Sequence, residues 1–286
     1  MFDLLKSLFI APAASSEAAR PTVPEGEIVY AIGDVHGCAD LLRALRKAIE
    51  KDLEQRPDLC VTILMLGDLV DRGPDSAGVV RQVRKWQRRS NVRVLAGNHE
   101  EMFLASFSDT DILRQFLRHG GRETLLSYGI LPKSYRSASV AEVQAMMNTA
   151  IPQQDRDFIA GFEDMVIIGD YAFVHAGIDP AAPLDQQMAS HLRWIREPFL
   201  SCQSLHEKVI VHGHTIAPEP QDRGNRIGLD TGAYVSGRLT ALVLHGTERR
   251  YIEVFRSNDG DIAVRHFGRT AGHLRSRKAD NVPGSL

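Results

Sequence analysis

Residues 28–37 read Ile-Val-Tyr-Ala-Ile-Gly-Asp-Val-His-Gly, an apolar run that gives way at once to glycine, a carboxylate and an imidazole. An apolar run of this length, rich in Val and Ile, is typical of a strand buried on both faces of an α/β sheet. The same arrangement recurs along the chain, and each run is followed directly by polar residues. The runs are Ile28–Ile32, Val61–Leu66, Val92–Leu95, Ala172–Val174 and Val209–Val211.

A short segment that combines glycine with Asp, Asn or His stands at the carboxyl end of each run. The five segments are Gly33–Gly37, Gly67–Gly73, Gly97–Glu100, His175–Gly177 and His212–Thr215. Ligands of open α/β sheets bind in the crevice at the carboxyl ends of the strands. We therefore expect the five segments to meet at one place and to form a single site.

The stretches between the first three strands predict helices. Ala39–Glu54 and Ser76–Arg89 are amphipathic with helical spacing. Residues 100–162 are expected to form a mostly helical insertion. After it, Val166–Ile168 and Tyr171–Val174 predict a hairpin with a two-residue turn between them.

The last part of the chain predicts mainly antiparallel strands, at Leu239–Leu244, Arg250–Phe255 and Ile262–His266. A β-α-β-α-β order, a helical insertion and then antiparallel strands do not describe a plain doubly wound sheet. They favour an α/β fold in which two packed sheets carry helices on their outer faces.

The two ends of the chain differ in composition from the part between them. Residues 1–25 are expected to form a flexible segment, either a frayed tail or a small docking helix. A secretion signal is disfavoured, because Lys6 stands where its apolar core should begin, although Ala11-Pro12-Ala13 resembles a cleavage site. Residues 270–286 predict a disordered tail, which leaves residues 26–269 as the folded domain.

The composition is that of an ordinary globular protein, with 43% hydrophobic and 24% charged residues. The net charge of −2 excludes a domain that holds nucleic acid by positive charge alone. Cys38, Cys60 and Cys202 lack CxxC spacing, which argues against a disulfide framework and favours a reducing cytoplasm. No apolar run approaches the roughly 20 residues that span a bilayer, so stable membrane insertion is not expected.

The donors in the five segments are carboxylate, imidazole and amide groups, without thiolates. This set suits Mn²⁺, Fe or Zn²⁺ in a catalytic site better than a structural zinc site. There are enough ligands for two ions, which a carboxylate can bridge, and two-metal centres hydrolyse phosphate esters. Each segment alone could be a turn, a helix cap or a loop, but their repetition at five strand ends favours a metal centre.

Gly33–Gly37, Gly67–Gly73 and Gly97–Glu100 match the patterns GDxHG, GDxVDRG and GNHE. On these motifs, and over about residues 28–245, the chain resembles the calcineurin-like metallophosphoesterases. Within them it is most similar to compact bacterial PPP phosphatases. The resemblance implies a four-layer α/β/β/α sandwich of two mixed sheets and a pair of divalent ions, with Mn²⁺ preferred and Fe or Zn²⁺ as alternatives.

The resemblance also implies a role for each polar residue. The implied ligands are Asp34 and His36 for the first ion, Asp68 for both ions, and Asn98, His175 and His214 for the second ion. His214 is preferred over His212, which would be a strand residue or a partner of a ligand.

His99 would be the general acid that protonates the leaving oxygen, with Asp71 holding its ring. We expect this carboxylate to fix the tautomer of His99 and to raise its pKa. A role for His99 as a further metal ligand is the alternative.

Phosphate oxygens also require cations. Arg72 is the first candidate, because its planar guanidinium can bind two oxygens. Arg196 stands where the resemblance implies a second phosphate-binding arginine, with a salt bridge to a neighbouring acid as its alternative role. The PPP pattern usually has arginine before GNHE, where this chain has Ala96. Arg118 and Arg122 are candidates to replace it.

The resemblance implies a phosphatase that acts on phosphoserine or phosphothreonine, and also on phosphotyrosine, so its partners would be phosphorylated proteins or peptides. The alternative is a symmetrical diadenosine tetraphosphate hydrolase or another small-molecule phosphoesterase. Those hydrolases tend to read VARG where this chain reads Val70-Asp71-Arg72-Gly73. Asp71 therefore favours the protein phosphatase, whereas Ala96 keeps the alternative open. A metal-binding scaffold without activity and a nucleic-acid phosphodiesterase are less favoured.

Overall fold

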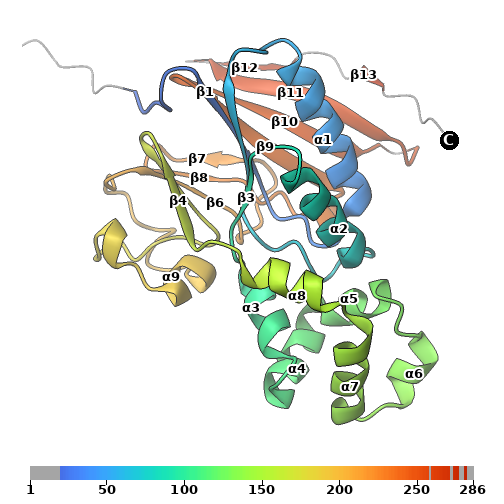
Figure 1. Cartoon of the computed structure of the whole chain (residues 1–286). Helices are drawn as coiled ribbons and strands as arrows, with labels where there is room; N and C mark the ends of the chain where they lie inside the picture. The colour runs from blue at the N-terminus through green and yellow to red at the C-terminus, as the bar shows by residue number, and fades with distance from the viewer. Residues whose placement is uncertain (1–19, 258, 271–272, 277–279, 282–286) are drawn as a thin grey trace, which may run out of the picture.

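The computed structural model describes residues 20–257, 259–270, 273–276 and 280–281. Most of the expected N-terminal segment, residues 1–19, lies outside the described residues. The described chain forms two mixed sheets, helices on their outer faces and a helical insertion at one end (Figure 1).

The larger sheet contains the first strands of the chain and the antiparallel strands of its last part. Its order is β12-β11-β10-β9-β1-β2-β3, with β13 paired to β11. β1 and β2 are parallel, as are β2 and β3, while β9 is antiparallel to both β1 and β10. The strands are β1 Glu27–Ile32, β2 Cys60–Met65, β3 Val92–Val94, β9 Arg238–His245, β10 Glu248–Arg256, β11 Ile262–Thr270, β12 His273–Ser276 and β13 Asp280–Asn281.

The smaller sheet has the order β4-β5-β6-β8-β7. β4 and β5 form the expected hairpin, and β5, β6 and β8 run parallel. The short strand β7 and the short helix α10 were not predicted from the sequence, because two to four residues are too few to show a period. The elements are β4 Met165–Ile168, β5 Tyr171–Val174, β6 Val209–His212, β7 Gln221–Asp222, β8 Arg226–Gly228 and α10 Ala233–Ser236.

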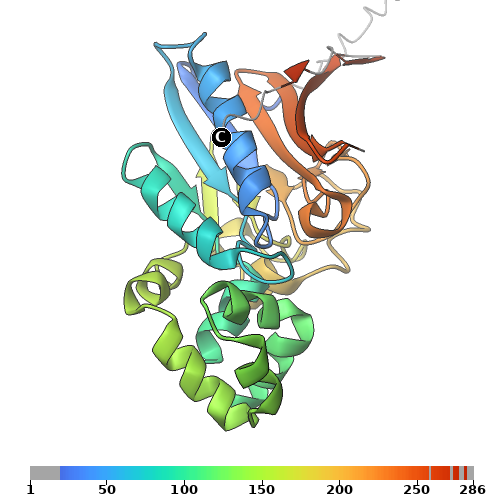
Figure 2. The ribbon, with the colours of Figure 1, turned by 90° about the vertical axis from the view of Figure 1, so that its right-hand side faces the viewer.

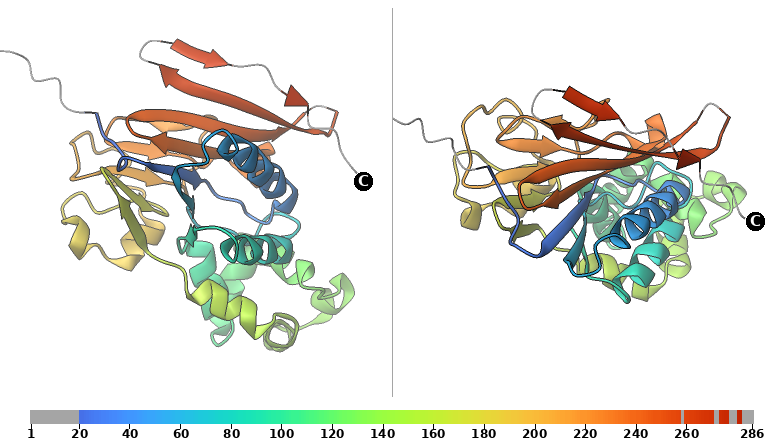
Figure 3. Two further views of the ribbon diagram at one scale, coloured as in Figure 1. Left: turned by 45° about the horizontal axis from the view of Figure 1, so that its top comes forward. Right: turned by 90° about the horizontal axis from the view of Figure 1, so that it is seen from above.

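The predicted four layers are present. Helices α1 (Ala39–Leu53) and α2 (Ser76–Gln87) cover the outer face of the larger sheet, and the smaller sheet packs on its inner face (Figures 1 and 3). Helix α9 (Ala189–Trp194) and the 3₁₀ turn η2 (Leu184–Gln186) contribute to the apolar cluster on the outer face of the smaller sheet.

Strand β1 shows why the first apolar run lacks alternation. Ile28, Tyr30 and Ile32 pack against the helices, whereas Val29 and Ala31 pack between the two sheets. Both faces of the strand are therefore buried, and a polar residue at any of these positions would lose its hydration.

The helical insertion, residues 98–160, confirms the expected helical stretch and lies below the sheets in Figure 2. It has an apolar cluster of its own, with Phe103 and Phe116 fully buried. Its elements are α3 Asn98–Ala105, α4 Thr110–Phe116, the π turn η1 Leu117–Gly121, α5 Arg122–Ser127, α6 Pro132–Ser137, α7 Val140–Ala150 and α8 Gln153–Ala160.

The structure differs from the sequence analysis at both ends of the domain. Val23, assigned to the flexible segment 1–25, is buried between the sheets, and its N–H donates to the carbonyl of Gly246 at 3.2 Å. At the other end, β12 and β13 lie within the stretch 270–286 that was expected to be disordered. Edge pairing uses backbone groups alone, so it leaves no apolar period in the sequence to detect.

None of the helices in the described part of the chain has the length and apolar character needed to cross a bilayer.

A buried ion pair fastens the helical insertion to the sandwich. Asp155 on α8 is 2% exposed and pairs with Arg84 on α2. The hydroxyl of Tyr128 donates to the second oxygen of the same carboxylate at 3.1 Å. The carboxylate of Asp155 thus has partners on both sides, which a buried charge requires.

We expect Asp155→Ala to lower the free energy of unfolding by about 3–5 kcal/mol, because it leaves the Arg84 charge without its buried partner. Urea denaturation measures the change. The matched control is Asp157→Ala on the same helix, where the exposed carboxylate accepts a hydrogen bond from the exposed Gln153 and a change below about 0.5 kcal/mol is expected. Equal effects of the two variants would contradict the role of the Asp155 pair.

Candidate metal centre

Asp68 lies at the centre of the site, in the loop that follows β2. Its carboxylate is 2% exposed and three imidazoles surround it. Oδ2 lies 3.4 Å from His36 Nε2 and 3.9 Å from His99 Nε2, and Oδ1 lies 3.4 Å from His175 Nε2. Burial raises the pKa of Asp68 to about 6, although the nearby charges of His99 and Arg72 oppose the rise.

Two groups of donors share this carboxylate. The first is Asp68 with His36 and His99, and the second is Asp68 with His175 and His214; within each group the donor atoms lie within 4.8 Å of one another. Asn98 belongs with the second group, because its Oδ1 lies 3.1 Å from His175 Nε2 and 2.9 Å from His214 Nδ1. The structure therefore brings together residues from five strand ends, those of β1, β2, β3, β5 and β6.

The tautomers of two imidazoles follow from their backbone partners. His36 Nδ1 lies 2.8 Å from the carbonyl of Val70, and His175 Nδ1 lies 2.8 Å from the carbonyl of Leu66. Each Nδ1 therefore carries the proton and donates it, which leaves a lone pair on Nε2. Both lone pairs face Asp68.

The donor set fits divalent cations. His175 Nε2 has a lone pair and faces two oxygen acceptors, Asn98 Oδ1 and Asp68 Oδ1. No proton is therefore available to form a hydrogen bond between this nitrogen and either oxygen. Burial lowers the pKa of His175 to about 4 and that of His214 to about 2, so both are neutral near pH 7. His214 Nε2 is buried and has no hydrogen-bond partner among the residues that the structure describes. Converging acceptors of this kind are stabilised by a cation.

Asp34 lies beside these groups but outside both of them. Its two carboxylate oxygens accept the backbone N–H of His214 at 3.2 and 3.0 Å. Burial, followed by the charges of Asp230 and Asp68, raises the pKa of Asp34 well above its usual value. Its assignment as a ligand of the first ion stays a prediction, as do the assignments of the other five ligands.

Asp230 is a residue that the sequence analysis missed. It is 2% exposed, it approaches the carboxylate of Asp34, and burial raises its pKa to about 6. It follows the strand β8 and the apolar Leu229, the same pattern that marks the five segments. The sequence analysis did not recognise the polar residues after Leu229 as a further segment of this kind.

Glu100 organises the loop that carries Asp68, a role that the sequence analysis did not assign. Its Oε2 accepts the backbone N–H groups of Asp68 at 2.8 Å and Gly97 at 2.9 Å, and its Oε1 accepts those of Leu69 at 2.7 Å and Val70 at 3.3 Å. One buried carboxylate thus holds two strand ends together. Burial raises its pKa to about 7.

The backbone of the site is strained. Among the residues that the structure describes, the non-glycine residues with positive φ are His36, Asp68, Asp71, Arg72 and His214. All five are site residues predicted from the sequence. L-residues rarely adopt this conformation, and its cost is typical of functional sites.

His99 and Asp71 form the expected pair, with 2.6 Å between His99 Nδ1 and Asp71 Oδ2 and both side chains buried. The expected rise in the pKa of His99 is wrong. Burial lowers that pKa below its usual 6.5 and the charge of Arg72 lowers it further, while Asp68 opposes them. The lost hydration of the imidazolium outweighs the neighbouring carboxylates.

The two predicted phosphate-binding arginines lie on different sides of the donors. Arg72 Nη1 lies 3.0 Å from His36 Nε2, at the first group. Arg196 is exposed and has no salt bridge among the described residues, and its charge lowers the pKa of His175 and His214 in the second group. The alternative of a salt bridge for Arg196 thus has no support in the described contacts.

The two candidates to replace the missing arginine, Arg118 and Arg122, differ in their contacts. Ala96 is buried and its N–H donates to the carbonyl of Glu163 at 2.8 Å. Arg122 is bound to Glu123 at 2.7 Å. Arg118 is exposed, next to His119, whose pKa is lowered by burial and then by the charges of His99, Arg72 and Arg118. The role of either arginine in replacing the missing one stays a prediction.

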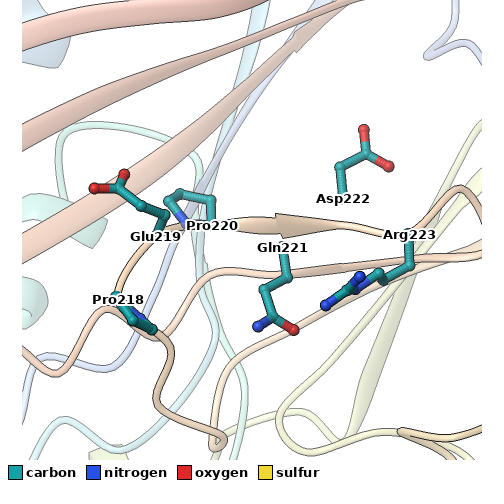
Figure 4. A pocket seen from close by; sticks show the side chains of 6 residues that line it. All are labelled: Pro218, Glu219, Pro220, Gln221, Asp222 and Arg223. Atoms are coloured by element: carbon teal, nitrogen blue, oxygen red, sulfur yellow. The ribbon is translucent and has the colours of Figure 1, made fainter. Parts of the chain in front are cut away.

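A pocket of about 330 Å³ at residues 218–223 shares no residue with the centre. Figure 4 shows its two carboxylates, Glu219 and Asp222, directed away from Gln221. Both are paired with arginines, Glu219 with Arg238 and Asp222 with Arg249. This pocket therefore offers no free anionic group to a ligand.

Comparison with known proteins gives a family and several relatives. The family model described as calcineurin-like phosphoesterase matches residues 28–246, more than half of the chain. An asymmetrical bis(5'-nucleosyl)-tetraphosphatase of Bacillus velezensis is 25% identical over 73% of this chain and 86% of its own length. A symmetrical bis(5'-nucleosyl)-tetraphosphatase of Janthinobacterium is 26% identical over 79% of this chain and 95% of its own length.

Two solved structures share the fold. A protein provisionally assigned as a diadenosine tetraphosphatase has a TM-score of 0.55 and 21% identity, over 86% of this chain and 97% of its own. A cold-active protein-tyrosine phosphatase of Shewanella has a TM-score of 0.51 and 17% identity, over 85% of this chain and 81% of its own.

We expect Mn²⁺ to raise the melting temperature of the protein and Asp68→Asn to abolish most of this rise, because the substitution weakens both donor groups at once. A ligand at 100 times its dissociation constant stabilises the native state by about 2.7 kcal/mol. Calorimetry with Mn²⁺ or EDTA measures the effect. The exposed Asp58→Asn is the control. Two equivalents of retained metal in Asp68→Asn would contradict the bridging position.

Proposed function

Since the chain belongs to the calcineurin-like phosphoesterase family and is a metal-dependent phosphoesterase, we propose that it hydrolyses bis(5'-nucleosyl) tetraphosphates. The observation that carries the proposal is that relatives of this chain are named as bis(5'-nucleosyl)-tetraphosphatases. Both asymmetrical and symmetrical tetraphosphatases align with about three quarters of this chain and with most of their own length. This substrate replaces the phosphoprotein that the sequence analysis favoured.

The arginines near the site favour a substrate with a long anionic chain, such as a tetraphosphate. Arg72 and Arg196 lie at the two donor groups, and Arg118 is exposed in the insertion. A tetraphosphate chain carries several negative charges, whereas a phosphomonoester carries about two. Guanidinium groups bind phosphate oxygens in pairs, so Arg72 and Arg196 would bind two parts of a chain of phosphates.

Two divalent cations, when bound at the groups around Asp68, would lower the pKa of a water molecule and polarise the phosphoryl oxygens. We propose Mn²⁺ for this role, on the basis of the oxygen and imidazole donors. The chain's own residues position the substrate and supply a proton.

The reaction forms a bond between a water oxygen and phosphorus and breaks the bond from phosphorus to the leaving oxygen, which takes the electron pair. In its imidazolium form His99 would give the Nε2 proton to that oxygen, while Asp71 accepts the Nδ1 proton at 2.6 Å. The attacking water gives up one proton to solvent, and His99 regains one proton from solvent, so the reaction balances.

Phosphoprotein phosphatase activity is the second candidate, and the Asp71–His99 pair is the observation that favours it. Serine and threonine leave as strongly basic alkoxides, which need a proton in the transition state. A departing nucleotide phosphate has a second pKa of about 6 and needs this proton much less. A well-built proton donor is therefore of most use with alkoxide leaving groups.

A direct comparison of substrates tests the proposal. We expect purified protein with Mn²⁺ to cleave diadenosine tetraphosphate faster than phosphoserine, phosphothreonine or phosphotyrosine peptides, and EDTA to stop cleavage. Chromatography of the nucleotides and a phosphate assay measure the two reactions. Release of phosphate from peptides without cleavage of the dinucleotide would establish the second candidate instead.

His99→Asn separates the role of proton donor from that of metal ligand. We expect the variant to retain its metal and to lose about 10²–10⁴-fold in turnover of alkyl phosphates, with a much smaller loss on the dinucleotide. Steady-state kinetics and metal analysis give the two readouts, with the half-exposed His191→Asn as control. Loss of one metal equivalent would show that His99 is a ligand.

A further inference from the structure

We infer that Thr124, delivered by the helical insertion, is a positioning residue that orients Asp71 and through it the proton donor His99. The inference rests on the hydrolytic function proposed above, but not on the identity of the substrate. It concerns a buried side chain that none of the sequence motifs contains.

The contact between Thr124 and Asp71 is short and fully buried. The hydroxyl of Thr124 donates to Asp71 Oδ1 at 2.6 Å, and its oxygen accepts the backbone N–H of Asp71 at 2.9 Å. Both residues are 0% exposed. The remaining oxygen, Oδ2, faces His99 Nδ1 at 2.6 Å. The two carboxylate oxygens therefore have one partner each, and the partners fix the plane of the carboxylate between them.

Ser76 is the third member of this group of buried hydrogen bonds. Its Oγ accepts the N–H of Asp71 at 3.0 Å and lies 2.9 Å from Thr124 Oγ1. Because Thr124 donates its only proton to Asp71, Ser76 must donate to Thr124. The hydrogen bonds thus converge on Asp71, which accepts the Thr124 hydroxyl at Oδ1 and the Nδ1 proton of His99 at Oδ2.

The helical insertion is docked closely enough to hold Thr124 in place. Gly120, in the π turn just before α5, accepts the backbone N–H of Arg72 at 3.1 Å. Gly120 has φ of 107°, and a Cβ at this position would lie 2.7 Å from Arg72 Cγ. The hydroxyl of Ser127, one helical turn after Thr124, accepts the backbone N–H of Ala77 at 3.1 Å. The insertion therefore contacts Arg72, next to Asp71 in the strained loop, and Ala77 in the first turn of α2.

Without the Thr124 hydroxyl, Asp71 Oδ1 would be a buried acceptor with no side-chain donor. Rotation of the carboxylate to find another donor would move Oδ2 and with it the imidazole of His99. The proton on His99 Nε2 would then be misdirected, and reactions whose leaving oxygen needs this proton would slow most.

We test this with Thr124→Val, which keeps the shape and removes the hydroxyl, and Thr124→Ser, which restores it. On aryl phosphates, Thr124→Val should lower kcat about 10-fold for phenyl phosphate and less than about 2-fold for 2,4-dinitrophenyl phosphate. Thr124→Ser should return kcat to within about 2-fold of the parent value. Thr149→Val is the matched control, since that hydroxyl is exposed and donates only to Ala145.

A second readout does not require turnover. In protein with ¹⁵N-labelled histidine and Zn²⁺, the Nδ1 proton signal that His99→Asn removes should shift in Thr124→Val and return in Thr124→Ser. If the parent protein cleaves no phosphate, the proposed function fails while this signal still tests Thr124. If Thr124→Val does not fold, Thr124→Ala takes its place.

An unchanged signal, or equal losses on both aryl phosphates in a folded and metal-replete variant, would overturn the role of Thr124. Such a result would leave the residue as a packing contact between the insertion and the sandwich.

Discussion

The whole site depends on the burial of one carboxylate, that of Asp68, among imidazoles whose lone pairs face it. A buried charge without partners is strongly destabilising. A neutral imidazole cannot donate a hydrogen bond to the carboxylate from the ring nitrogen that carries the lone pair. The backbone carbonyls of Val70 and Leu66 fix those lone pairs by binding the opposite ring nitrogens. The arrangement is therefore complete only with cations between the donors, and the fold supports that arrangement at a cost in backbone strain.

The strain is concentrated where the strand ends meet and is offset by a few buried hydrogen bonds. Asp68 has φ of 50° and Asp71 has φ of 73°. Glu100 binds four backbone N–H groups of the two adjoining loops, and Thr124 and Ser76 bind the N–H of Asp71. Each of these acceptors holds a conformation that the loop would not adopt alone.

Much of the fold follows from local pattern. Strands such as β1 are buried on both faces and leave apolar runs, and the polar residues after them mark the crevice where they end. Asp230, Glu100 and Thr124 are different, because their importance lies in contacts made across the chain. Thr124 lies 53 residues after Asp71, on a helix whose sequence does not mark this threonine as different from other helix residues. No period or motif predicts such a contact, so three-dimensional packing is needed to find it.

The helical insertion joins the chemistry to the choice of substrate. It carries Thr124, which binds the carboxylate that holds the proton donor, and the carbonyl of Gly120 accepts the backbone N–H of Arg72. A displacement of the insertion would therefore alter both the cations that meet a phosphate chain and the carboxylate that orients His99. In a two-sheet scaffold that supplies the same donors to many phosphoesterases, this coupling makes the insertion the element through which leaving-group preference and substrate length can change together.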